Sequence, residues 1–183
     1  MAIAAQTRRL LINFIAFELG WFAVVLGAAR NFLGVGLLVA ALVVLLHLWL
    51  SLQPRREIQL VLLVLLLGTG WDSVLTVAHI IVYPSGQYVS YLAPIWITAV
   101  WVLFATTLNV SLVFLRRRYG LAALFGAIGA PLSFLGGMKL HALSFPDLSL
   151  SLSVLALGWA LLMPILIWLA PRFDGVVLSR STA

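Results

Sequence analysis

Long apolar segments fill most of this 183-residue sequence, and they restrict its fold more than any other feature. A helix needs roughly 20 mostly apolar residues to cross a bilayer. Six windows meet this requirement, at residues 10–29, 32–52, 58–82, 91–115, 119–141 and 148–170. They are continuous and rich in Leu and Ala, whereas membrane strands alternate apolar and polar residues over about ten positions. We therefore predict an all-α membrane protein with six transmembrane helices.

The composition agrees with a membrane protein that has no soluble domain. Only 9% of the residues are charged and 64% are hydrophobic, whereas about a quarter of the residues of soluble domains are charged. The connections between the windows are short, so sequential helices should be antiparallel neighbours. We expect one polytopic domain over residues 1–183, folded as an antiparallel bundle. The sequence has no cysteine, which excludes disulfides and Cys-ligated metal centres.

The positive charges predict the orientation of the bundle. Nine of the eleven Lys and Arg residues lie before the first window, in the second and fourth connections and after the last window: Arg8, Arg9, Arg55, Arg56, Arg116, Arg117, Arg118, Arg172 and Arg180. Such residues favour the cytoplasmic side of a membrane. Both termini should then be cytoplasmic, and the net charge of +6 is explained by topology without a nucleic-acid partner.

The third window carries an acid in the middle of its apolar run. Read at helical spacing, its polar residues form one stripe: Thr69, Asp72, Thr76, His79 and Tyr83. Since the other faces of this helix are Leu, Val and Ile, the stripe should face protein or water and not lipid. We therefore expect a polar cavity lined by this helix.

A second intramembrane acid, Glu18, lies in the first window. The helical rise places Glu18 roughly 13 Å from Arg9 and Asp72 roughly 22 Å from Glu57, so both acids fall in the middle third of the membrane. A charge at that depth costs about 2.5–3.5 kcal/mol on insertion scales and needs a partner, a proton or water.

The two acids admit a functional and a structural interpretation. They could bind a proton, a cation or a polar head group in a cavity, because intramembrane acids are functional candidates by default. Alternatively they could be buried ion pairs that fix the helix register, for instance Asp72 with Lys139. The candidate cations of the outer half are Arg30 and Lys139, whose long stems can reach inward, and His79 on the same stripe as Asp72.

The remaining polar and small residues predict helix packing. Asn13 and Asn109 should form hydrogen bonds between helices. Small residues recur on one face of the first window and on one face of the fifth, which predicts that these two helices pack tightly: Ala16, Gly20, Ala23 and Gly27, then Gly126, Gly129, Ala130, Ser133 and Gly137.

The three histidines do not indicate a metal or haem site. His79 and His141 fall near the outer surface and His47 near the inner one, and no His-Glu-x-x-His spacing is present. We predict no metal and no cofactor.

Four segments carry a resemblance to a known family: NFIAFELGWFAVVLGAA at 13–29, GWDSVL at 70–75, APIWITAVWVLFATTLN at 93–109 and GAIGAPLSFLGG at 126–137. Together they resemble a family of small bacterial inner-membrane proteins that is classed only as a domain of unknown function. The resemblance implies a gene that, as is the tendency in that family, is encoded beside enzymes that alter fatty acyl chains, including cyclopropane-type methyltransferases. The resemblance implies an inner-membrane location and a lipid setting, with membrane lipids and a lipid-modifying enzyme as possible partners.

These observations favour a protein that binds or translocates a small or lipid-like ligand through a polar cavity. Its ligand or proton site would comprise Asp72, Glu18, His79, Thr69 and Thr76, with Asn13, Asn109, Arg30 and Lys139 in support. One alternative is a lipid-modifying enzyme in which Asp72 and His79 act as an acid–base pair. Another is a non-catalytic subunit that docks a soluble lipid enzyme through its Arg-rich face. No motif indicates catalysis, so the sequence favours a protein that is not an enzyme.

The predicted topology has a direct test. Reporter proteins fused at residue 86 and at the C-terminus should report opposite sides of the membrane, with the C-terminus cytoplasmic, because the basic residues flank only one set of connections. Two reporters on the same side would show that the number of spans is wrong.

Overall fold

The computed structural model describes residues 2–176 and consists of helices joined by short connections. In chain order these are α1 (Ala2–Ala29), α2 (Leu33–Trp49), α3 (Pro54–Val77), α4 (Ile95–Leu108), the 3₁₀ turn η1 (Val113–Leu115), α5 (Tyr119–Lys139), α6 (Leu148–Leu169) and the 3₁₀ turn η2 (Ala170–Phe173). No strand occurs in this range, apart from an isolated bridge between Val82 and Ser144. The prediction of an all-α fold is confirmed.

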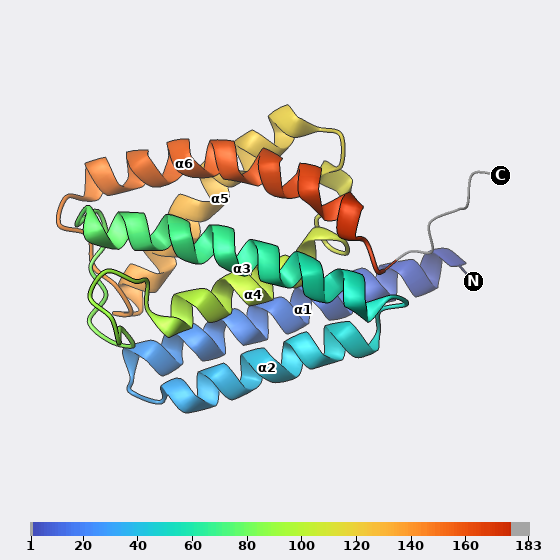
Figure 1. Ribbon diagram of the computed structural model, residues 1–183, viewed down its shortest axis with the longest axis horizontal. Coiled ribbons are helices and arrows are strands. Elements are labelled where there is room, and N and C mark those ends of the chain that lie inside the picture. Colours follow the sequence, from blue (N-terminus) through green and yellow to red (C-terminus); the bar gives the residue numbers. More distant parts are fainter. Residues whose placement is uncertain (1, 177–183) are drawn as a thin grey trace.

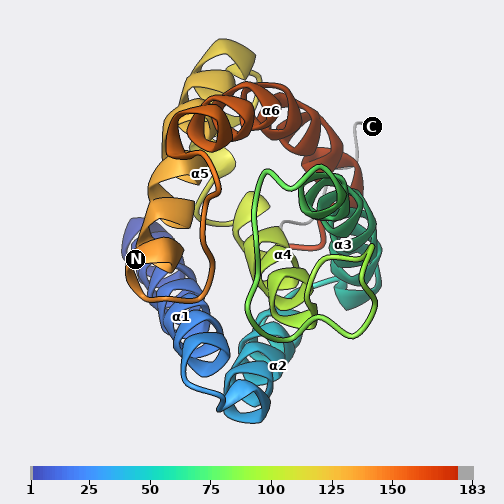
Figure 2. The ribbon, with the colours of Figure 1, turned by 90° about the vertical axis from the view of Figure 1, so that its left-hand side faces the viewer.

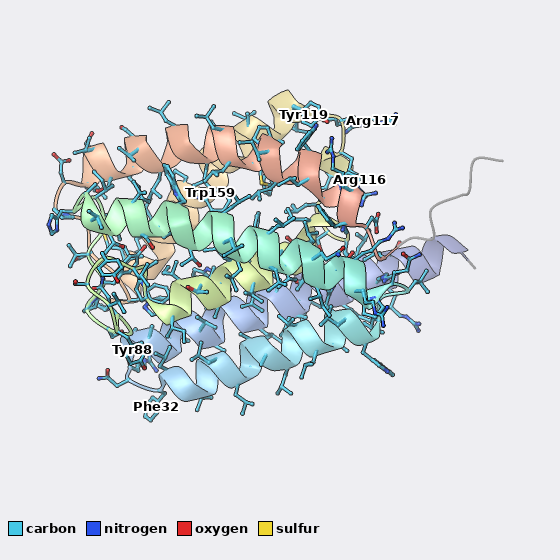
Figure 3. The ribbon with its side chains drawn as sticks, viewed as in Figure 1. Phe32, Tyr88, Arg116, Arg117, Tyr119 and Trp159 are labelled. Carbon is cyan, nitrogen blue, oxygen red and sulfur yellow. The ribbon has the colours of Figure 1, made fainter. Side chains whose placement is uncertain are left out.

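The six α-helices run up and down along the long axis of the molecule, so that their connections gather at its two ends (Figure 1). Phe32 and Tyr88 mark one end, and Arg116, Arg117 and Tyr119 mark the other (Figure 3). The basic connections lie at the second end together with the start of α1 and with η2, as the charge pattern predicts (Figure 1). Arg180 lies outside the described residues.

Within residues 2–176, four helices are long and apolar enough to cross a membrane: Thr7–Ala29 of α1, Pro54–Val77, Tyr119–Lys139 and Leu148–Phe173. Large apolar side chains cover their outer faces, for example Leu66, Leu161 and Leu157, which are 66%, 70% and 71% exposed. Soluble monomers rarely expose contiguous apolar surface on this scale. These helices suggest a membrane protein.

The other two helices are shorter than predicted. α2 has 17 residues and α4 has 14, which correspond to about 26 Å and 21 Å of helix. α2 nevertheless exposes Leu38, Leu42 and Leu45 along one face. α4 lies inside the ring that the other five helices form (Figure 2), and most of its residues are buried. Backbone that leaves a helix is tolerated at membrane depth where protein surrounds it, which explains why α4 need not extend over the predicted 91–115.

Glycines allow several close contacts between helices. The position of a Cβ atom at Gly36 of α2 is 2.6 Å from the Ala23 carbonyl oxygen of α1. On α1 itself, Gly20 faces the Leu103 side chain of α4 at 2.8 Å. The close packing predicted for the small residues of α1 is therefore confirmed at Gly20 and Ala23.

Two tryptophans lie directly on glycines of neighbouring helices. The Trp101 indole of α4 covers Gly68 of α3, and the Trp71 indole of α3 covers Gly158 of α6. A side chain at either glycine would overlap the ring. These two contacts fix the positions of α4 and α6 against α3.

The contact at Gly68 leads to a prediction. Gly68→Ala should lower the free energy of unfolding by about 1–3 kcal/mol, because the added methyl group must displace the buried Trp101 ring. Gly70→Ala is the matched control on the same helix, since no atom lies within 4 Å of the added methyl group. The measurement is thermal unfolding of both variants in detergent. Equal stability of the two variants would contradict the packing described here.

Candidate functional site

A cavity of about 450 Å³ lies between α1, α4, α5 and α6. The α5 backbone runs close to α6 but not to α1 or α4, and the face of α5 that looks toward the cavity is built from small residues: Gly126, Gly129, Ala130, Ser133 and Gly137. Of these, Gly126 contacts the Trp159 backbone of α6, whereas the only atom within 4 Å of a Cβ atom at Gly129 belongs to Phe125 of the same helix. The tight packing predicted for α5 is therefore confirmed against α6 at Gly126, and Ala130 and Gly137 are also buried. At Gly129 the small residue leaves open space instead.

Eight aromatic residues line the cavity, among 21 lining residues in all. They come from α1, α4, α5 and α6: Phe17, Trp21, Trp96, Trp101, Phe104, Phe125, Phe134 and Trp159. The indoles of Trp101 and Trp159 are stacked, with ring centroids 4.7 Å apart and planes within 8°. Phe104 meets both indoles edge to face, at 6.1 and 5.4 Å. Trp159 lies inside the helical bundle (Figure 3).

Asp72 is the one residue of α3 on the cavity wall, and its side chain is fully buried. Trp101 Nε1 donates to Asp72 Oδ2 at 2.6 Å, and the Tyr83 hydroxyl donates to Oδ1 at 3.1 Å. Each carboxylate oxygen therefore accepts a hydrogen bond from a neutral donor. The suggested ion pair of Asp72 with Lys139 is wrong, since Lys139 is exposed at the end of α5.

Tyr83 reaches Asp72 from outside α3. The helix ends at Val77, and His79 follows with a φ of 53° that turns the chain. Burial, and after it the negative charge of Asp72, raises the pKa of Tyr83 well above its ordinary value. Tyr83 consequently remains a hydrogen-bond donor at neutral pH.

The predicted polar stripe is helical only over Thr69, Asp72 and Thr76, because α3 ends at Val77. Thr69 Oγ1 donates to Thr98 Oγ1 of α4 at 3.2 Å, and Thr76 Oγ1 donates to the Asp72 backbone carbonyl at 2.7 Å. His79 lies beyond the helix and is exposed. Of the five residues of the stripe, Asp72 lines the cavity and the other four do not.

Glu18 lies on the opposite wall of the cavity, on α1. It is half-buried and forms no hydrogen bond or ion pair with the side chains described for residues 7–176. Arg30, a candidate partner, is exposed after the end of the same helix. The structure thus brings Glu18 and Asp72 to one cavity and leaves Arg30, Lys139 and His79 outside it.

Asn13 forms the predicted bonds between helices. Its Nδ2 donates to the Thr106 carbonyl of α4 at 3.1 Å, and its Oδ1 accepts from the Ser111 hydroxyl at 2.5 Å. These bonds link α1 to the end of α4. They stabilise the wall of the cavity without facing into it, which corrects the supporting role expected of Asn13 at the site.

A second polar cluster surrounds Glu57 at the basic end. Glu57 is fully buried; its Oε2 lies 2.9 Å from His47 Nε2, and its Oε1 accepts from Asn109 Nδ2 at 3.0 Å and from the Gly175 N–H at 2.7 Å. Arg116 extends the cluster by donating to Asn109 Oδ1. Both oxygens of the Glu57 carboxylate thus accept hydrogen bonds from protein groups. Because His47 lies on α2 and Glu57 on α3, the cluster links the chain at Gly175 to these two helices.

Sequence reasoning missed Glu57 because it lies beside Arg55 and Arg56 in what reads as a polar turn. The available signal was Pro54, which occupies the first position of α3. A proline at this position marks the start of a helix, and the N-terminus of a helix stabilises a negative charge. An acid in the first turn of the helix can therefore be part of the helix and point into the bundle.

None of the described residues forms a group of three or more His, Cys, Asp or Glu side chains that could hold a metal ion. The ionisable groups of the cavity are its two acids. The site can therefore accept hydrogen bonds or pair with a cation, and its rings can contact apolar groups.

The family comparison covers most of the helical bundle. A family described as a protein of unknown function, DUF2878, matches residues 10–165. The chain belongs to this family. No curated protein and no solved structure matches the chain. The DUF2878 match includes both cavity acids, and its description gives no activity, so the function has to be argued from the site.

The two bonds to Asp72 generate a prediction. Asp72→Asn leaves one oxygen to accept from Trp101 and Tyr83, so one buried donor loses its acceptor at a cost of about 1–3 kcal/mol. Combining it with Tyr83→Phe should cost less than the sum of the single changes, because the orphaned hydroxyl is then absent. Unfolding of the three variants in detergent measures the coupling. Strictly additive losses would contradict the direct bond.

Proposed function

We propose that this protein binds a lipid-like ligand in the cavity between α1, α4, α5 and α6, and holds a polar group of that ligand at Glu18. The observation that carries the proposal is the Glu18 carboxylate, which has no partner among the described side chains and lies on a mainly apolar wall. A charge at membrane depth is expensive unless something pairs with it. A bound ligand would supply that partner.

The size and chemistry of the cavity support a ligand of this kind. Small-molecule sites in proteins measure roughly 300–1,000 Å³ and combine apolar walls with a few polar groups; this cavity has about 450 Å³. The aromatic rings suit an alkyl or isoprenoid body. The two acids suit a polar end, since they are the charged groups of the wall.

The exposure of the wall supports entry from the bilayer. Leu132 lines the cavity and is 61% exposed, and Phe125 lines it and is 43% exposed. Both lie on α5, away from its ends, and Glu18 lies about 16 Å from the end of α1. An opening at this depth faces the acyl chains and not either aqueous side. Binding, or binding followed by translocation across the membrane, is the function that this geometry favours.

The proposal includes the membrane arrangement expected from the sequence: six spans in a bacterial inner membrane, with both termini cytoplasmic. The enzyme alternative has less support, because Asp72 bonds to Trp101 and Tyr83 while His79 is exposed. A role as a docking subunit for a soluble lipid enzyme rests on the basic end alone.

A cavity-filling variant tests the proposal. Gly129→Phe should reduce the lipid-like ligand that co-purifies with the protein by about tenfold or more, because the ring occupies the open part of the cavity. Native mass spectrometry and lipid analysis of the purified protein measure the ligand. Gly120→Phe on the same helix is the matched control, because a Cβ atom there meets no atom within 4 Å and Gly120 is not on the wall. Equal occupancy in the wild type and both variants would refute a ligand in this cavity.

A further inference from the structure

We propose that the ligand of this cavity is an amphipathic organic cation, with an ammonium or quaternary ammonium head at Glu18 and an apolar chain among the rings. The inference rests on the proposed function and specifies the substrate class of the same site. It follows from the charges on the wall, from the difference between the two acids, and from the rings on the same wall as Glu18.

The charges on the wall are of one sign. Glu18 and Asp72 line the cavity, and no Lys, Arg or His residue of the described chain lines it. Lys139 and Arg30 are exposed at helix ends. An anionic head group would meet two carboxylates in a low-dielectric site, where repulsion between like charges is strong. A cationic head group would compensate their charge.

The two acids differ in what they can still bind. Both oxygens of Asp72 already accept hydrogen bonds, from Trp101 and Tyr83. Glu18 has no such donors among the described side chains. A neutral donor such as a hydroxyl would satisfy one lone pair and leave the charge uncompensated, whereas a cation compensates the charge itself. Glu18 is therefore the contact for the cationic head.

Several aromatic residues share the cavity wall with Glu18. Phe17 precedes it on α1, Trp21 follows one helical turn later, and Phe104 of α4 meets Phe17 edge to face at 6.5 Å. The face of a Trp or Phe ring attracts a cation within about 6 Å, and such rings are the usual binding groups for quaternary ammonium. Metal cations of the Ca²⁺ or Mg²⁺ type need about six oxygen ligands, which this wall does not offer. The combination of one free carboxylate with these rings selects an organic cation.

The space beside Gly129 fits the apolar part of such a molecule. Trp21 of α1 reaches α5, where its Cη2 atom lies 3.3 Å from the position of a Cβ atom at Gly136. The ring thus bridges α1 and α5 at one point of the cavity wall. An alkyl chain can extend from the head past Gly129 toward the exposed Leu132, and so into the bilayer.

The test compares two probes of equal chain length on the full-length protein in a non-ionic detergent. Dodecyltrimethylammonium carries the cation and dodecanol does not. Binding is read from the shift in thermal unfolding with probe concentration. We expect the cation to bind about tenfold or more tightly than the alcohol, and Glu18→Gln to remove most of that preference by weakening the cation much more than the alcohol.

Three variants distinguish a failure of the cation proposal from a failure of ligand binding in the cavity. Glu18→Asp keeps the charge and should retain the preference, and Gly129→Phe should weaken both probes. Glu18→Gln should fold normally because Glu18 bonds to no described side chain. Equal affinity for both probes, or a preference that survives Glu18→Gln, would overturn the cation proposal and leave cavity binding intact, provided that Gly129→Phe still weakens both. If Gly129→Phe changes neither, or no probe binds, then the proposed function fails and the cation inference fails with it.

Discussion

The position of one indole determines much of this structure. Trp101 lies flat on Gly68 of α3, stacks on Trp159 of α6 and donates its N–H to Asp72. Three helices thus meet at a single side chain of the central helix α4. Large rings at this point keep α6, and with it α5, at a distance from α1. The cavity exists because the bundle is held apart by aromatic side chains on one side and lined by small residues on the other.

The overall architecture could be predicted from the sequence because apolar windows of membrane length have few alternatives to helices. The ends of the third and fourth helices could not be predicted in this way. Residues 78–82 are as apolar as the helix before them, yet the chain turns at His79 and Val82 pairs with Ser144 near α6. That turn depends on a contact between residues far apart in the sequence, which hydrophobicity along a window does not contain.

The same holds for the candidate site: the acids could be identified from the residues next to them in the sequence, whereas their contacts with other elements could not. Asp72 and Glu18 were identifiable because an acid inside an apolar run is conspicuous, and both reach the cavity. Their different environments were not identifiable, since Trp101 and Tyr83 approach Asp72 from other elements. Glu57 was hidden because adjacent arginines make a buried acid look like part of a solvated turn.

The stacked pair of Trp101 and Trp159 also gives the molecule an intrinsic optical signal. Two nearly parallel indoles with centroids 4.7 Å apart have coupled electronic transitions, and their contribution to ultraviolet circular dichroism depends on how one ring is rotated in its plane relative to the other. Since both rings border the cavity, a molecule that enters it changes their surroundings directly. The native protein therefore contains its own spectroscopic reporter of cavity occupancy, and neither a label nor an added chromophore is needed.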